Sequence, residues 1–347
     1  MLKSFGALPS GNRLEKIKKS PQYKNGSFQN LFETQVMVEG ASFLKIMKNF
    51  YSKGVDREPP AVLPSVKTDL KAFSSEKPAV IWFGHSSYLI FIDGKKILVD
   101  PVFSPSPSPV QALGKKNYAG SMPYTIEELP DLDIVLITHD HYDHLDYDSI
   151  IKLRSKTKLF CATLGVGAHL NYWGISDERI VEFDWWETKT IMPGIELTAT
   201  PSRHFSGRLI KRFQTLWASY VLQAGDCKIF IGSDSGYDGA FKIIGEKYGP
   251  FDLAMLECGQ YNANWPSIHM MPEETAQASI DLRAKVFMPV HWAKFTLSLH
   301  SWNDSIKRVT DEAKRLNLKI TTPMIGEPVI LNNVLPNLHW WEQVGKN

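Results

Sequence analysis

Short apolar runs rich in Val, Ile, Phe and Tyr recur along the chain from Ala79 onward. The run Ala79 to Ile92 is followed by Asp93-Gly94 and by a second run, Lys95 to Val99. Asp-Gly between two such runs predicts a β-hairpin. Later runs of strand length are Leu132 to Thr138, Lys158 to Ala162, Ile180 to Phe183, Ile195 to Thr200, Ala218 to Gln223, Lys228 to Ile231 and Leu253 to Glu257.

Helices are expected between several of these strands. Candidates lie at about Asp146 to Arg154 and Val166 to Trp173, and the proline and acidic residues of Pro272 to Glu274 mark a further helix start. The strands are too numerous for one open parallel sheet. The pattern therefore predicts an α+β fold in which two mixed β-sheets are flanked by helices.

The first 75 residues have a different pattern. Residues 1–40 mix Lys, Ser, Gly and Asn with scattered aromatic residues, as in an arm that lies on another surface. From Ala41 to Lys53, apolar residues recur at helical spacing with lysines between them, which predicts a short basic amphipathic helix. Packing on the domain is its commoner role, and contact with a membrane surface is the alternative. We expect residues 1–75 to form this arm and residues 76–347 the main domain.

Charge and cysteine content narrow the possible partners. The 347 residues include 39 Lys or Arg and 37 Asp or Glu, so the net charge of +2 argues against a nucleic-acid partner. Residues 1–75 carry 12 basic and 6 acidic residues, so the basic surplus lies in the arm. The three cysteines have no C-x-x-C spacing, and no run suits a signal peptide or membrane span. A cytoplasmic location is expected, with peripheral membrane contact as a further possibility.

The densest chemistry follows the predicted strand Leu132 to Thr138, in the sequence T-H-D-H-Y-D-H-L-D. Its His139, His141, Asp143 and His144 occupy one loop. Unpaired imidazoles and carboxylates are costly to desolvate at the end of a core strand unless a cation offsets that cost. The loop therefore predicts a metal site.

Three further candidate ligands stand where other strands should end. His204 follows I-E-L-T-A-T-P-S-R, Asp234 follows K-I-F-I-G-S, and His291 follows K-V-F-M-P-V. One such histidine alone is more often a hydrogen-bonded polar residue than a ligand. Together with the four loop residues they form a set of seven. Imidazole and carboxylate without thiolate suit Zn²⁺ in an open, catalytic site, with iron or manganese as alternatives.

This ordered set resembles the signature of the metallo-β-lactamase superfamily, H-x-H-x-D-H followed by a distant His, Asp and His. Other stretches between Ile81 and Trp292 resemble the N-acyl-phosphatidylethanolamine-hydrolysing phospholipase D branch. They are W-F-G-H-S-S, V-D-P-V-F-S, T-I-E-E-L-P, E-F-D-W-W-E, G-P-F-D-L-A and M-P-V-H-W. The resemblance implies an αβ/βα sandwich, two zinc ions and a plausible homodimer.

The resemblance also implies an assignment of the ligands. One ion would be held by His139, His141 and His204, and the other by Asp143, His144 and His291, with Asp234 bridging the two. Two ions about 3.5 to 4 Å apart would share a hydroxide and stabilise charge on a phosphoryl or acyl oxygen.

The branch-level resemblance implies a phosphodiesterase of phospholipase D type that acts on an N-acyl-phosphatidylethanolamine-like phospholipid. A metal-bound hydroxide, oriented by Asp143, would attack phosphorus. His269 matches in position a histidine that the branch carries near its substrate phosphate, and it would protonate the leaving alkoxide. A lactonase or another hydrolase of this fold on a small soluble substrate is the alternative. A non-catalytic metal- or lipid-binding protein is the third reading, although it would be expected to have lost a ligand.

Further residues are candidates for roles around the metals. Asp100 and His85 are expected to hydrogen-bond the metal-binding side chains, although Asp100 also suits a turn and His85 a buried strand position. Trp185, Tyr261 and Trp292 would line an apolar channel for acyl chains, or else belong to the core. Basic residues that face either lipid phosphates or solvent are Arg208, Lys211 and Arg212.

Overall fold

Two β-sheets form the centre of the protein. The computed structural model describes residues 2–50, 52, 55–208 and 211–346. The first sheet contains β3 (Ala79–Trp82), β4 (Tyr88–Ile92), β5 (Lys95–Val99), β6 (Leu132–Ile137), β7 (Thr157–Thr163), β8 (Ile180–Phe183) and β15 (Pro328–Ile330). The second contains β9 (Thr188–Met192), β10 (Ile195–Thr200), β11 (Ser219–Ala224), β12 (Cys227–Ile231), β13 (Leu253–Glu257) and β14 (Phe287–Val290).

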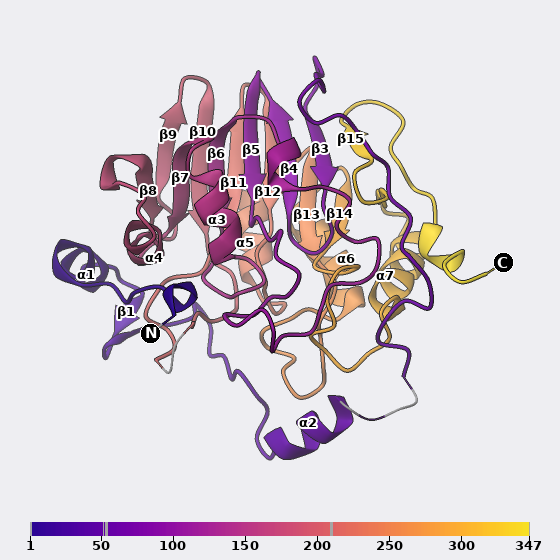
Figure 1. Cartoon of the computed structure of the whole chain (residues 1–347), viewed down its shortest axis with the longest axis horizontal. Coiled ribbons are helices and arrows are strands. Elements are labelled where there is room, and N and C mark those ends of the chain that lie inside the picture. Colours follow the sequence, from indigo (N-terminus) through magenta and orange to yellow (C-terminus); the bar gives the residue numbers. More distant parts are fainter. Residues whose placement is uncertain (1, 51, 53–54, 209–210, 347) are drawn as a thin grey trace.

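Both sheets are mixed, which confirms the predicted architecture (Figure 1). The seven-stranded sheet has the order β15-β3-β4-β5-β6-β7-β8, and the six-stranded sheet has the order β14-β13-β12-β11-β10-β9. Strands β5 to β8 are parallel, as are β12 to β14, whereas the remaining neighbours are antiparallel. The expected Asp-Gly hairpin is the antiparallel pair β4 and β5.

The sheets pack face to face, and helices cover their outer faces. The principal helices are α3 (Tyr147–Leu153), α4 (Gly167–Tyr172), α5 (Ala240–Tyr248), α6 (Pro272–Asp281) and α7 (Asp304–Arg315). Alternate residues of β4 belong to different clusters: Tyr88 and Ile90 join the core between the sheets, while Leu89 joins the core beneath α3 and α4. Both faces of β4 are therefore buried, which explains its unbroken apolar sequence.

The run Ala79 to Ile92, predicted as one strand, is in fact two. The strands β3 and β4 pair antiparallel, and the chain turns between them. His85 lies in this turn with a φ of 53°, so its expected position inside a strand is wrong. Gly84 and the two serines of G-H-S-S suit a turn, but the apolar residues on both sides led to the prediction of one strand.

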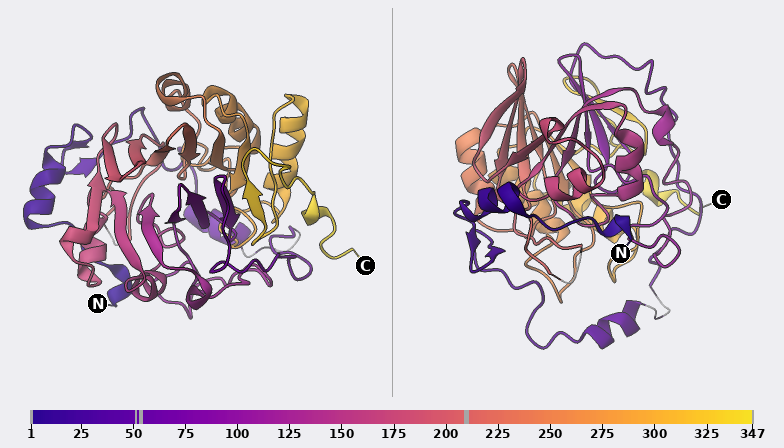
Figure 2. Two further views of the ribbon diagram at one scale, coloured as in Figure 1. Left: turned by 90° about the horizontal axis from the view of Figure 1, so that it is seen from above. Right: turned by 60° about the vertical axis from the view of Figure 1, so that its left-hand side comes forward.

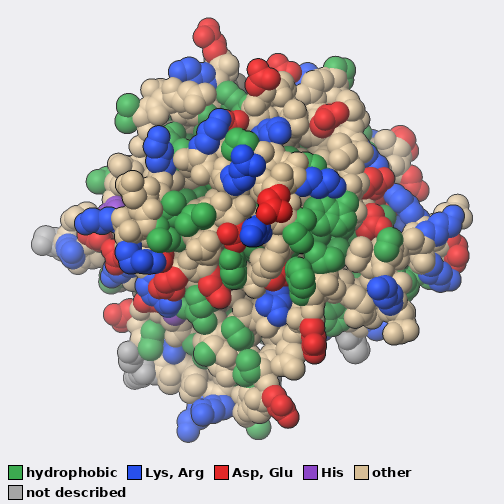
Figure 3. Space-filling view, turned by 180° about the vertical axis from the view of Figure 1, so that it is seen from behind, with side chains coloured by type: hydrophobic (Ala, Val, Ile, Leu, Met, Phe, Trp, Pro, Cys, Tyr) green, Lys and Arg blue, Asp and Glu red, His purple; other side chains and the backbone are tan. Residues whose placement is uncertain are grey.

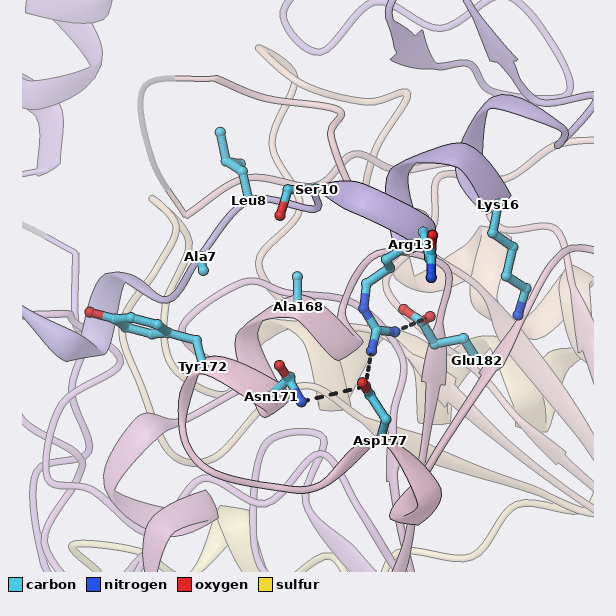
Figure 4. Close-up of a pocket in the computed structure, with 11 residues that line it drawn as sticks. Ala7, Leu8, Ser10, Arg13, Lys16, Ala168, Asn171, Tyr172, Asp177 and Glu182 are labelled. Carbon is cyan, nitrogen blue, oxygen red and sulfur yellow. Dashed lines mark hydrogen bonds and ion pairs between the residues drawn. The ribbon is translucent and has the colours of Figure 1, made fainter.

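The N-terminal arm is fastened to the first sheet. It contains η1 (Lys3–Phe5), α1 (Gly11–Lys18) and the small hairpin β1 (Tyr23–Lys24) and β2 (Ser27–Phe28). Figure 4 shows Arg13 of α1 pointing to Glu182 and Asp177, with which it forms ion pairs. A cavity of about 560 Å³ separates the start of the arm from α4.

The predicted basic helix is α2 (Phe43–Phe50), which lies apart from both sheets (Figure 2). The end predicted for it, Lys53, lies outside the described residues. Leu44 on this helix is 80% exposed. Beyond it, Leu63 and Leu70 are buried against the main body, and the division at residue 75 stays a prediction.

The surface seen from behind carries interspersed positive and negative side chains (Figure 3). Within the described part of the chain, we find no helix with the length and hydrophobicity needed to cross a bilayer.

Helices α5 and α6 approach closely at Gly245. A Cβ atom there would lie 1.9 Å from the carbonyl oxygen of Asp281, which is too close for any side chain. We expect Gly245→Ala to lower the free energy of unfolding by about 1 to 3 kcal/mol, because the helices must separate. Urea denaturation measures this change. Glu246→Ala, an exposed neighbour on the same helix, should leave stability nearly unchanged, and equal stability of the two variants would contradict the predicted contact.

Candidate metal centre

The loops that follow several strands meet at one edge of the two sheets. His139 to His144 follow β6, His204 follows β10, Asp234 follows β12, and His291 follows β14. Parallel strands bring their carboxyl ends to the same edge, so residues far apart in sequence become neighbours.

The seven predicted ligands are gathered there in two adjacent groups. One group has His139, His141, His204 and Asp234, with one potential ligand atom of each within 4.8 Å of the others. The second has Asp143, His144, His291 and also His85 within the same limit.

Asp234 lies between the groups. Its Oδ2 is 3.2 Å from His144 Nε2, and its Oδ1 is 3.1 Å from His291 Nδ1. The same Oδ2 is 3.8 Å from Nε2 of both His139 and His204. This position suits a carboxylate shared by two ions, and the division of ligands between the ions stays a prediction.

The donor set fits divalent cations. His144 Nε2 and Asp234 Oδ1 are fully buried, and their contacts with Asp234 Oδ2 at 3.2 Å and with His291 Nδ1 at 3.1 Å lack hydrogen-bond geometry. Buried polar atoms are normally hydrogen-bonded, so two such atoms facing one cluster indicate a bound cation. Each group offers imidazole nitrogens with carboxylate oxygens, a mixture that suits zinc and related transition metals.

The protonation states also favour metal binding. Burial, reinforced by neighbouring histidines, holds the pKa of His139 well below its usual value, and burial does the same for His204 and His291. Burial also lowers the pKa of His144, but the nearby Asp234, Asp143 and Asp100 outweigh it and raise that pKa. Mostly neutral imidazoles beside ionised carboxylates are the form that binds a cation, and loading the site displaces the proton of His144.

Asp100 contacts a predicted ligand, His144. Its Oδ2 lies 2.7 Å from His144 Nδ1, and it also accepts hydrogen bonds from the backbone and hydroxyl of Thr138. This contact leaves His144 Nε2 directed at the cluster. Asp100 therefore fixes both the tautomer and the ring plane of His144.

His85 contacts a carboxylate of the site directly. Its Nε2 is 2.9 Å from Asp143 Oδ2, and its ring lies 4.0 Å from the ring of His291. The backbones of the two turns are also joined: His85 N–H donates to the Trp292 carbonyl, and His291 N–H donates to the His85 carbonyl. The turn after β3 and the loop after β14 are therefore held together by backbone hydrogen bonds.

Three residues of the centre have left-handed backbone conformations. The φ angles are 53° at His85, 40° at Asp100 and 68° at His291. Such angles are uncommon for residues other than glycine and are retained where the surrounding structure requires them. Here they turn the side chains back toward the cluster directly after β3, β5 and β14.

Glu257 is a site residue that the sequence did not single out. It is the last residue of β13 and is 1% exposed. Its Oε2 is 2.8 Å from His269 Nδ1, while its Oε1 accepts from the backbone of Ser235 and Met270. The sequence did contain one signal for this role: Glu257 ends a predicted strand, and Asp234 and His291 also stand at strand ends.

Glu257 and His269 form a pair beside the predicted ligands. Burial raises the pKa of Glu257 to about 7. Burial lowers the pKa of His269, but the charge and hydrogen bond of Glu257 outweigh it and raise that pKa to about 9. The His269 ring lies 5.0 Å from His204 and 5.4 Å from His291, so a proton donor stands next to the cluster.

The three predicted channel aromatics are buried. Trp185 donates to the Trp217 carbonyl, and Trp292 stacks between Trp82 and Trp340. Tyr261 stacks on a histidine and bonds a carboxylate of α7. All three are 5% exposed or less, so substrate contact stays a prediction without support from their positions.

A sequence profile described as the Beta-lactamase superfamily domain matches residues 95–292. The chain belongs to the metallo-β-lactamase superfamily. An uncharacterized protein of Mycobacterium tuberculosis is 36% identical over 93% of this chain and 87% of its own length. The superfamily predicted from the ordered ligand set is thereby confirmed.

Two relatives carry functional names. A Caenorhabditis elegans protein named N-acyl-phosphatidylethanolamine-hydrolyzing phospholipase D 1 is 31% identical over 71% of this chain and 74% of its own length. A mitochondrial protein of the same name from Saccharomyces cerevisiae is 35% identical over 62% of this chain and 48% of its own.

Among solved structures, a metallo hydrolase of Ignicoccus hospitalis has a TM-score of 0.59 and 21% identity. It covers 74% of this chain and 100% of its own. This likeness supports the fold alone. The superfamily and the two ligand groups together identify the protein as a metal-dependent hydrolase.

Asp100→Asn tests whether the hydrogen bond between Asp100 and His144 contributes to metal affinity. An amide has one acceptor oxygen, so it cannot accept from the Thr138 backbone N–H, which bonds Oδ1, and from His144, which bonds Oδ2, at once. We therefore expect zinc affinity to fall about 10- to 100-fold. Competition with a chromophoric chelator measures it. The matched control is Asp133→Asn, which removes a carboxylate that holds Lys158 and the Lys96 backbone at the start of β6. Unchanged zinc affinity in Asp100→Asn would show that the contact does not tune the site.

Proposed function

We propose that the protein is a zinc-dependent phosphodiesterase of phospholipase D type, acting on an N-acyl-phosphatidylethanolamine-like phospholipid. The observation that carries the proposal is the 31% identity over 71% of the chain with the worm protein named for that activity. Two adjacent ligand groups, with Asp234 of the first also close to His144 and His291 of the second, offer a matching centre. When bound, two divalent cations would lower the pKa of water and offset charge on a phosphoryl oxygen.

Within this proposal, Asp143 holds the attacking water. Burial raises the pKa of Asp143, but His144 and the hydrogen bond from His85 outweigh it and keep the carboxylate ionised. An ionised Asp143 accepts a hydrogen bond from water and directs its lone pair at phosphorus. His85 keeps Asp143 in that orientation.

The leaving group in this proposal takes its proton from His269. Its Nδ1 is held by Glu257, which leaves Nε2 free to donate. An alkoxide leaving from phosphorus needs a proton as its bond breaks, and a histidine that is protonated at neutral pH supplies it. The Glu257 carboxylate stabilises His269 before the transfer.

Helix α2 adds support for a lipid substrate. Leu44, Lys45 and Lys48 are exposed on a helix that lies apart from the sheets (Figure 2). An apolar side chain flanked by lysines is typical of a helix that contacts an anionic membrane surface.

Asp143→Asn in the full chain tests the proposal. We expect the zinc-loaded protein to release phosphatidic acid and N-acylethanolamine from N-acyl-phosphatidylethanolamine vesicles, as measured by mass spectrometry. Asp143→Asn should lose at least about 100-fold in kcat while remaining folded, since it no longer orients water. Asp148→Asn, an exposed carboxylate on α3, is the control. Hydrolysis of a lactone with none of the phospholipid would favour the lactonase alternative.

His269→Asn separates proton donation from the rest of the site. With phospholipid as substrate, kcat should fall about 100- to 10,000-fold, because the alkoxide then leaves unprotonated. With bis(p-nitrophenyl) phosphate the loss should be far smaller, since p-nitrophenolate leaves without a proton. Equal losses on the two substrates would contradict the assigned role.

A further inference from the structure

We infer that Arg208 is a positioning residue of the metal centre, which closes the loop His139 to His144 and joins it to the N-terminal segment Lys3 to Ala7. The inference rests on the metal centre alone and does not depend on which substrate is hydrolysed. It also corrects the expectation for Arg208, which is 5% exposed and faces neither solvent nor an open lipid site.

One guanidinium nitrogen holds both ends of the ligand loop. Arg208 Nη1 donates to the carbonyl oxygen of Asp140 at 2.8 Å and to that of Leu145 at 2.6 Å. These residues bracket His141 to His144, which include three predicted ligands. Fixing the two carbonyls therefore fixes the span of the loop. A lysine has one donor nitrogen on a flexible stem and lacks the planar fork of arginine.

The guanidinium group is also held in place by two aromatic rings. Its central carbon lies 4.1 Å from the ring centre of Tyr142 and 5.2 Å from that of Trp173. Tyr142 belongs to the ligand loop and donates its hydroxyl proton to the Arg208 carbonyl oxygen. The described side-chain hydrogen bonds of Arg208 end on backbone carbonyls, with no carboxylate among them. Burying a cation in this way is costly, which favours a specific positional role.

The N-terminal segment reaches the ligand loop by two routes. Arg208 Nη2 donates to the Ser4 carbonyl oxygen at 2.7 Å. The Ala7 N–H donates to His169 Nδ1 at 3.1 Å, and His169 Nε2 is 3.3 Å from Asp140 Oδ2. Through His169, the N-terminal segment therefore also contacts the carboxylate of Asp140, which lies between the predicted ligands His139 and His141. Figure 1 shows this segment, in indigo, below α3 and α4.

Gly6 is required for the second route. Its φ is 77°, and a Cβ there would lie 2.1 Å from His169 Nδ1. Any side chain would push His169 away from Asp140 or lift the segment off the domain. The segment therefore has a fitted contact with His169 and does not merely lie on the surface.

Zinc affinity of the full-length protein tests the inference without any substrate. Arg208→Lys should bind zinc about 10- to 100-fold more weakly than wild type in competition with a chromophoric chelator, the range expected when support of ligands is lost. The matched control is Arg179→Lys, because Arg179 also donates to three carbonyls, of Arg154, Thr157 and Lys158, at the opposite end of β7. Arg179→Lys should keep wild-type zinc affinity.

Unfolding of the metal-free proteins separates positioning from general stability. Both variants should remain folded and unfold cooperatively in urea, while only Arg208→Lys loses zinc affinity. If Arg208→Lys does not fold, Gly6→Ala tests the same coupling and should also bind zinc more weakly. Wild-type affinity in a folded Arg208→Lys, or in Gly6→Ala, would overturn the inference. Absence of phospholipid hydrolysis would overturn the proposed function and leave this test intact.

Discussion

The central constraint on the structure is the free-energy cost of burying a dense group of imidazoles and carboxylates at one edge of the two sheets. His139, His144, His204, His291 and Asp234 are all 2% exposed or less. Without a cation, this group leaves buried atoms unpaired and lowers the pKa of several histidines far from neutrality. Bound metal ions offset this cost.

The architecture around this edge serves to hold side chains in place. Parallel strands in both sheets deliver their carboxyl ends to the same region, and the apolar core on both faces of the first sheet fixes where those ends lie. The supporting contacts then repeat one theme. Asp100 holds His144, His85 holds Asp143, and Glu257 holds His269. Each pair leaves one reactive atom directed at the cluster.

The ligands themselves were predictable because each stands directly after an apolar run that could only be a strand. For β8, β10 and β13 the run and the strand have the same bounds. The turn at His85 was missed, since Gly-His-Ser-Ser is a weaker turn signal than Asn-Gly or Asp-Gly. Strands at the sheet rims, such as β9 and β15, carry too few apolar residues to form a pattern.

Contacts between segments that are distant in the sequence are the second kind of feature that could not be predicted. Arg208 sits in a polar stretch that is typical of a solvated loop, and only the fold brings Ser4, Asp140 and Leu145 around it. From the sequence, Trp185 and Trp292 suited the core more often than a channel, and only their packing partners place them in the core. Glu257 was hidden because a glutamate at a strand end has no motif of its own.

The metal content of the purified, full-length protein tests the central claim most directly. Elemental analysis after exposure to zinc and removal of excess metal should give close to two ions per chain, and Asp234→Ala should lose both, since Asp234 lies between the two ligand groups. A wild-type protein that retains no ion, or an Asp234→Ala variant that retains two, would contradict a shared two-metal centre.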